Sequence, residues 1–156
     1  MRTLISSLII VMLVFSLSLA FTPGEARKAI ESMGIEYTPE SFVKAATEGN
    51  TKAVEMFLAA GMDPDVEANG TRAILESSCG EIDIVRLLIN AGAEVNVAKK
   101  GGGTPLEEAA NARSPEIVRL LLSNGADPNL GSPLSMARKR NSREIMDILI
   151  KAGARE

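Results

Sequence analysis

Four copies of one short pattern constrain the fold of this chain more than any other sequence feature. Each copy consists of an apolar triplet, two further residues and a glycine. The triplets begin at Met56, Leu87, Leu120 and Ile148, and the glycines are Gly61, Gly92, Gly125 and Gly153. The glycines lie 31, 33 and 28 residues apart. A period of this length is typical of solenoids, in which each unit must stack on its neighbours because it cannot bury its apolar face alone.

The apolar triplet marks the end of a helix in each copy. Together with the pair that precedes it, such as Ile117-Val118 in the third copy, the apolar residues fall at i, i+1, i+3, i+4 and i+5. This stripe is too broad for a helix with a single buried side. We therefore expect neighbouring units to cover these helices on both sides, and the glycine to end each helix.

A second helix precedes the triplet helix, and its start signal is clearest in Thr104-Pro105-Leu106-Glu107. The threonine suits the N-cap, the proline suits the first helical position, and the glutamate can accept a hydrogen bond from the cap backbone. Ser132-Pro133 and Thr38-Pro39 repeat the cap and the proline without the glutamate. Each unit is thus predicted to contain two helices, followed after the glycine by an extended finger.

These units resemble ankyrin repeats, which run near 33 residues as two helices and a β-turn. The resemblance rests on TPLEEAA with LLLSNGADPN in the third unit, LLINAGAEVN in the second, AATEGN with AAGMDPD in the first, and SPLSMA with AGA in the fourth. It implies an all-α ankyrin-repeat solenoid of stacked helix-turn-helix units with short β-turn fingers. The expected repeats are 38–69, 70–102, 103–131 and 132–156.

Two departures from the family pattern carry structural expectations. The histidine of the family's T-P-L-H motif is replaced by Glu107, Ser135, Ile74 and Val43. The hydrogen bonds that this histidine makes between helices must therefore be replaced or absent. Glu76 stands where the pattern has a buried alanine, and a buried unpaired carboxylate is costly. We expect Glu76 to tilt outward or to pair with a neighbour such as Arg72.

The N-terminal segment differs from the repeats. Leu4 to Phe21 contains no charged residue, and Ser18-Leu19-Ala20 has the small-x-small form of a signal-peptidase site. We expect residues 1–20 to be a signal peptide and residues 21–37 to form a capping helix and lead-in. The helix is expected from Ala26 to Met33, with Gly34 ending it.

Two alternatives remain for this segment. Residues 4–21 reach the lower end of a membrane-spanning length, so they could be a retained anchor, although four serines weaken that reading. A buried N-terminal helix is the third reading. Signal peptide and anchor both place the repeats outside the cytoplasm, either secreted or, in a bacterium, in the periplasm.

The composition excludes several functional classes. A net charge of −3 does not favour nucleic acid as a partner. The chain has no histidine, the usual general base, and its one cysteine excludes an internal disulfide. No nucleophile has a recognisable base beside it, so no catalytic residue, metal ligand or cofactor is predicted. Asp63-Pro64-Asp65 and Asp127-Pro128-Asn129 could suggest calcium, but we expect them to shape the turns after the glycines.

The family resemblance implies a concave surface, formed by finger tips and first helices, as the place where partners bind. Carried over by position, the candidate binding residues are Thr47, Glu48, Ser78, Cys79, Lys100, Gly103, Asn111, Arg138, Lys139 and Arg140. The alternative is that each of them is an ordinary solvated turn residue. The charge of this set is graded from Glu48 at one end to Arg138-Lys139-Arg140 at the other.

Three local features of this set have competing readings. The basic run Arg138-Lys139-Arg140 could contact phosphate or an acidic partner, or it could be the polar outer face that a terminal repeat needs. Cys79 could form an intermolecular disulfide or be an inert, half-buried small residue. The glycine-rich run 99–103 lacks the residue order and context of a nucleotide loop, so we discount phosphate binding there.

Together these observations predict a non-catalytic protein-protein interaction module. It would be a monomer without cofactors, would bind another protein as a scaffold or inhibitor, and would touch a membrane only if the N-terminal segment is retained. The first alternative is a membrane-tethered assembly factor. The second is an enzyme with an unrecognised site.

Overall fold

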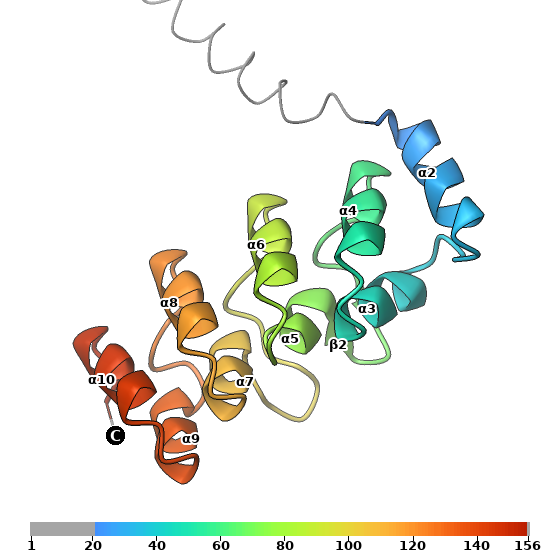
Figure 1. Ribbon diagram of the computed structural model, residues 1–156. Helices are drawn as coiled ribbons and strands as arrows, with labels where there is room; N and C mark the ends of the chain where they lie inside the picture. Colours follow the sequence, from blue (N-terminus) through green and yellow to red (C-terminus); the bar gives the residue numbers. More distant parts are fainter. Residues whose placement is uncertain (1–20, 156) are drawn as a thin grey trace, which may run out of the picture.

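The computed structural model describes residues 21–155, so the predicted signal peptide at 1–20 lies outside the described residues. An N-terminal helix, α2 (Pro23–Ser32), is followed by four helix pairs. The pairs are α3 (Pro39–Thr47) with α4 (Thr51–Ala59), α5 (Ala73–Ser77) with α6 (Ile82–Asn90), α7 (Pro105–Asn111) with α8 (Pro115–Ser123), and α9 (Pro133–Lys139) with α10 (Arg143–Lys151). The first helices form one row and the second helices another, as Figure 1 shows. The predicted all-α solenoid of stacked helix-turn-helix units is confirmed.

One helix pair falls in each of the ranges 38–69, 70–102, 103–131 and 132–155. The division between successive repeats within the fingers remains a prediction. In residues 21–155, no helix is long and apolar enough to cross a membrane.

The middle residue of each apolar triplet lies in the core. Phe57, Leu88, Leu121 and Leu149 are all fully buried. The second helices also pack on one another along the row, since α4 contacts α6, α6 contacts α8 and α8 contacts α10. Coverage on both sides therefore holds for the inner second helices. At α10, the last described helix, which packs on α8 and α9, Ile150 is 54% exposed.

The capping helix begins earlier than predicted. It starts at Pro23 instead of Ala26, because Thr22 and Glu25 form a complete capping box: the Thr22 hydroxyl accepts from the Glu25 backbone, and the Glu25 carboxylate accepts from the Thr22 backbone at 2.7 Å. The sequence signal, a threonine and proline with glutamate three residues after the cap, is the same one that marks α7. Gly34, with φ at +72°, follows the last turn as expected.

Glu107 both caps its own helix and reaches the next repeat. Thr104 Oγ1 accepts from the Glu107 backbone at 3.2 Å, and Glu107 Oε2 accepts from the Thr104 backbone at 2.9 Å, which confirms the predicted capping box. The other carboxylate oxygen accepts from the backbone N–H of Ser132 at 2.8 Å. This bridge takes the place of the inter-helix contacts of the family's histidine. Ser132 was predicted to cap α9, but its side chain makes no cap hydrogen bond.

The finger between α4 and α5 is a short antiparallel hairpin of β1 (Glu67–Ala68) and β2 (Thr71–Arg72). Its turn is Asn69-Gly70, with φ at 54° and 78°. Positive φ at both turn residues is the requirement of a type I′ turn, and Asn-Gly satisfies it at little cost.

A ladder of side chains ties each finger to the next repeat. The Asp65 carboxylate accepts from the Glu94 backbone at 3.1 Å. Asn96 donates to Gly125 O at 2.9 Å and accepts from the Asp127 backbone at 2.8 Å. Asn129 repeats this arrangement one unit later, on Gly153 O and the Arg155 backbone. The ladder fixes neighbouring fingers relative to one another in addition to the apolar core.

Candidate functional site

The surface formed by the first helices α3, α5, α7 and α9 and by the fingers is the candidate site, and we call it the inner surface. Most residues predicted for this surface are accessible. Those exposed to solvent are Thr47, Glu48, Cys79, Lys100, Arg138, Lys139 and Arg140. Gly103 and Asn111 are partly buried.

Ser78 does not belong to this surface, and its prediction as a binding residue was wrong. Its side chain is fully buried, and its hydroxyl donates to the carbonyl oxygen of Ile74 at 2.6 Å. The hydroxyl thus turns back onto the backbone of its own short helix, where its hydrogen-bonding needs are met internally. Thr47, the equivalent residue of the first repeat, makes the same kind of bond to Val43 O but remains exposed.

A groove opens between α3 and the β1–β2 finger. Its volume is about 530 Å³, and its charged walls come from Glu40, Lys44, Glu48 and Glu76. Lys44 pairs with Glu48 at 3.7 Å, but both side chains are mostly exposed, so the pair adds little stability. The groove therefore carries more carboxylates than cations.

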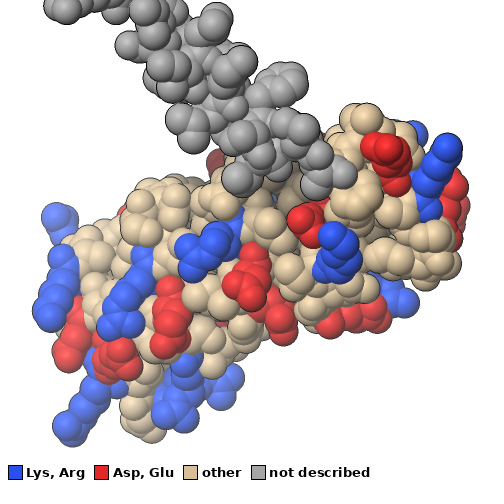
Figure 2. Space-filling view, turned by 45° about the horizontal axis from the view of Figure 1, so that its top comes forward, with Lys and Arg blue, Asp and Glu red and all other residues tan. Residues whose placement is uncertain are grey.

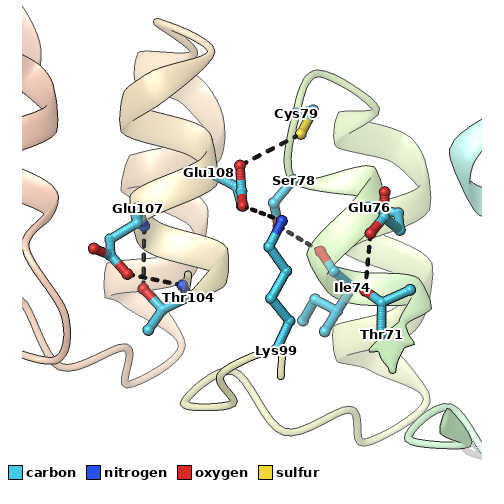
Figure 3. Close-up of polar contacts among 9 residues, drawn as sticks. All are labelled: Thr71, Ile74, Glu76, Ser78, Cys79, Lys99, Thr104, Glu107 and Glu108. Atoms are coloured by element: carbon cyan, nitrogen blue, oxygen red, sulfur yellow. Dashed lines mark hydrogen bonds and ion pairs between the residues drawn. The ribbon is translucent and has the colours of Figure 1, made fainter. Parts of the chain in front are cut away.

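Glu76 is held on the wall of this groove by a neutral partner. Its Oε1 accepts from the hydroxyl of Thr71 at 2.8 Å (Figure 3). Of the two alternatives expected for Glu76, pairing with Arg72 does not occur, because that guanidinium lies 3.6 Å from both Asp65 and Glu94, near the ladder. Glu76 remains partly accessible, as the outward-tilt alternative requires.

A polar cluster joins the second and third repeats. Glu108 extends from α7 between two residues of the preceding repeat (Figure 3): its Oε1 lies 2.7 Å from Lys99 Nζ, and its Oε2 lies 3.9 Å from Cys79 Sγ. The pairing of Glu108 with Lys99 could not be predicted from the sequence, because it depends on how adjacent repeats stack. The hydrogen bond to Glu108 raises the pKa of Lys99, so this cation stays charged.

Cys79 is exposed, yet its environment does not activate it. Burial of the sulfur raises the pKa of the thiol, and the neighbouring Glu108 carboxylate raises it further. A thiol is a nucleophile only as the thiolate, so the neutral form that this site favours reacts slowly.

The long finger before α7 is tied down at its base. Lys99 N donates to Gly103 O at 3.0 Å, and Lys100 N contacts Gly70 O of the preceding hairpin at 3.4 Å. Gly103 has φ at +94°, and a Cβ there would press against Glu108 and Lys99. Of the two lysines in this loop, Lys99 is thus already paired with the Glu108 carboxylate, whereas Lys100 is exposed.

Basic side chains gather at the other end of the inner surface. Arg140 Nε donates to Asn111 Oδ1 at 2.8 Å, which links the ends of α7 and α9. Figure 2 shows several Lys and Arg side chains at the end of the molecule formed by α9 and α10, with Asp and Glu side chains between them. Lys139, in the last turn of α9, adds to this charge.

The aspartates of the turns after the glycines accept hydrogen bonds from the local backbone. Asp63 Oδ1 accepts from the Asp65 backbone at 2.9 Å, and Asp127 Oδ1 accepts from the Asn129 backbone at 2.8 Å, as the turn reading predicted. Within residues 21–155, no group of three or more His, Cys, Asp or Glu side chains could hold a metal ion.

Comparison with known proteins identifies the repeats. Residues 42–132 match a family model described as ankyrin repeats, in three copies. The chain is 33% identical over 112 residues to the ankyrin repeat, SAM and basic leucine zipper domain-containing protein 1 of Ovis aries, an alignment that covers 67% of this chain and 23% of that protein. It is 32% identical over 137 residues to an ankyrin repeat-containing protein of Treponema pallidum (strain Nichols), covering 83% of this chain and 46% of that protein.

A third relative is the potassium channel AKT2/3 of Arabidopsis thaliana, 30% identical over 118 residues, which cover 72% of this chain and 15% of the channel. The chain therefore spans less than half the length of each of these relatives. The shared part is the repeat array, and ankyrin repeats generally mediate binding to other proteins.

Proposed function

Because this chain belongs to the ankyrin repeat family, we propose that it is a non-catalytic module, exported from the cytoplasm, that presents its inner surface to a partner protein as a scaffold or inhibitor. The observation that carries this proposal is the fixed arrangement of the inner surface. Asp65, Asn96 and Asn129 each bind the backbone of the following repeat. A surface that is already ordered loses little conformational entropy when a partner binds.

Export is supported by the N-terminal sequence. Leu4 to Phe21 is free of charge and ends beside a small-x-small site, which favours cleavage after Ala20. Cleavage there removes Arg2 and changes the net charge from −3 to −4. The same uncharged segment supports the second candidate, an assembly factor tethered to the membrane by residues 4–21.

Site-specific photocrosslinking in the native cells tests the interaction. A photoreactive amino acid is placed at Thr47 or Lys139 on the inner surface, and at Arg86 or Glu116 on the second helices as matched controls. We expect one discrete crosslinked protein from both inner positions and none from the control positions. Equal crosslinking from both sides, or none above background, would overturn the proposal.

N-terminal sequencing and cell fractionation test the compartment. An exported, cleaved protein begins at Phe21 and leaves the cytoplasmic fraction. An intact Met1 in the membrane fraction favours the tethered assembly factor. An intact Met1 in the cytoplasm contradicts export in either form.

A further inference from the structure

The two ends of the inner surface carry opposite charge. At the first repeat, the first helix ends at Thr47 and its C-cap is Glu48; at the fourth repeat, the equivalent residues are Lys139 and Arg140. All four side chains are exposed. The same structural position thus changes from neutral and acidic to doubly basic along the array.

The acidic end includes two carboxylates that the fold itself does not need. Glu76 occupies the position at which the other three repeats have a buried alanine (Ala45, Ala109 and Ala137). Its one hydrogen bond is to Thr71, and it forms no ion pair with any residue in 21–155. Lys99 attracts Glu76 electrostatically without forming an ion pair with it. A half-buried carboxylate without an ion-pair partner costs stability relative to that alanine.

Glu48 is the second such residue. It is the C-cap of α3, where the partial negative charge of the helix end disfavours a carboxylate. Lys44 pairs with Glu48 at 3.7 Å, but both side chains are mostly exposed, so the pair offsets little of this cost. Residues that break a local rule are expected at functional sites. Glu76 and Glu48 face the same groove, with Glu40 on its wall, so three carboxylates and one cation, Lys44, line it.

The basic end has a different local setting. Lys139 lies in the last turn of α9, where positive charge is favourable, and Arg140 is oriented by its hydrogen bond to Asn111. This arrangement holds one guanidinium in place over the junction of α7 and α9.

We infer that the inner surface binds an extended segment of the partner protein with Lys or Arg at one end and Asp or Glu at the other. The cationic side chain enters the groove beside Glu76 and Glu48, and the acidic side chain meets Lys139 and Arg140. This inference rests on the proposed function, because it specifies the chemistry of the partner. Because the two ends of the inner surface carry opposite charges, they also set the direction in which the segment lies.

The spacing of the two charges in the partner follows from the helix packing. The groove lies between α3 and α5, and the stack continues through α7 to α9. With packed helices about 8–10 Å apart, the groove and the end of α9 are separated by about 20–25 Å. An extended chain covers this distance in about seven residues at about 3.3 Å each.

Synthetic peptides test the charge and the spacing on the full chain. The probe peptide has two lysines at one end and two glutamates at the other, separated by about seven Gly/Ser/Thr residues. It is synthesised in two versions, with the lysines at the N-terminus or at the C-terminus. The controls have the same composition with a spacer of about two residues, or only one sign of charge. Fluorescence anisotropy should show at least about tenfold tighter binding of one order of the long peptide, falling steeply between about 50 and 300 mM salt. Equal binding of all peptides would overturn the inference.

Glu76→Ala is the most informative variant, because alanine is the residue that three of the four repeats already have. We expect peptide affinity to fall about tenfold while the melting temperature stays unchanged or rises, as for loss of one charged contact. Glu116→Ala, an exposed carboxylate on the second helix α8, is the matched control and should leave the peptide affinity unchanged. A loss of stability with unchanged affinity would assign Glu76 a structural role and contradict the inference.

Three outcomes separate this inference from the proposed function. A crosslinked partner whose binding ignores both salt and Glu76→Ala overturns the charge inference and leaves the proposed function intact. The absence of any crosslinked protein overturns the proposed function itself. Concentration-dependent self-association in sedimentation experiments, abolished by Lys139→Glu with Arg140→Glu, would mean that a second copy of this chain is the occupant, and would overturn the inference in favour of a dimer.

Discussion

The carboxylate of Glu107 accepts a hydrogen bond from the backbone N–H of Ser132 at 2.8 Å, across the junction of the third and fourth repeats. The same side chain caps its own helix through the backbone of Thr104 at 2.9 Å. One carboxylate therefore satisfies two backbone donors in successive repeats. The position is the one at which the family motif has histidine.

Removal of this carboxylate should weaken the last repeat most. Glu107→Ala leaves the N–H groups of Thr104 and Ser132 without their partner, and we expect a loss of about 1–3 kcal/mol. Glu107→Gln should lose less, because an amide has one acceptor oxygen and can keep one of the two bonds. Denaturant unfolding measures the loss, and hydrogen exchange at Ser132 locates it. Unchanged exchange at Ser132 would contradict the bridge.

Gly131 should be required because of this same carboxylate. Its φ is +74°, and a Cβ there would overlap the carboxylate of Glu107. Gly125, with φ at +88° and open space around it, is the matched control. Both alanine variants bear about 1–2 kcal/mol of left-handed backbone strain, but only Gly131→Ala also displaces Glu107. Thermal unfolding should show a larger loss for Gly131→Ala, and equal losses would exclude the close approach.

The ladder should contribute through pairs of hydrogen bonds. Asn96→Ala removes the bonds to Gly125 O and the Asp127 backbone, and we expect a loss of about 1–2 kcal/mol because water replaces them in part. Asn96→Asp keeps the acceptor but loses the donor, so its effect should be intermediate. Faster amide exchange at Asp127 in Asn96→Ala, but not in the aspartate variant, would locate the acceptor bond. Unchanged amide exchange at Asp127 in both variants would contradict the hydrogen bond between Asn96 and the Asp127 backbone.

Leu121 should be among the most sensitive core positions. It is fully buried in the last turn of α8, and its replacement by alanine opens a cavity between packed helices. We expect Leu121→Ala to destabilise the chain by about 2–5 kcal/mol, measured by denaturant unfolding. Leu122→Ala, a partly exposed neighbour on the same helix, should cost less. If Leu121→Ala lowered the free energy of unfolding by less than about 1 kcal/mol, the assigned register of the repeats would be wrong.

The reactivity of Cys79 should depend on Glu108. Burial and the Glu108 carboxylate both raise the thiol pKa, so alkylation near neutral pH should be slower than for a free cysteine. Glu108→Gln removes a negative neighbour, lowers the pKa, and should move the pH–rate profile of iodoacetamide alkylation to lower pH. Lys99→Met should act in the opposite direction, because Lys99 lowers the thiol pKa. A wild-type pH–rate profile that lies at the same pH as that of free cysteine, or at lower pH, would contradict the environment described for Cys79.

Much of the fold could be predicted from local patterns. The capping box of Thr104 and Glu107 depends on residues three apart, and the apolar triplets depend on helical spacing, so both can be read along the chain. The earlier start of α2 at Pro23 was equally readable, since Thr22 and Glu25 form the same motif. The accessibility of most candidate residues was predictable from their position in the repeat, whereas Ser78 is buried; their role in binding stays a prediction.

The sequence by itself determined that this chain is a stack of two-helix units, because each unit repeats the same caps, apolar stripe and glycine. Only the tertiary structure decided the contacts between units: Glu107 on Ser132, Glu108 between Cys79 and Lys99, and Asp65 bound to the Glu94 backbone where Arg72 also lies. Those partners are about 25–30 residues apart in most cases, and their pairing follows from how the repeats stack. Whether Ser78 faced the solvent was likewise decided by the rotation of a five-residue helix, α5, against its neighbours.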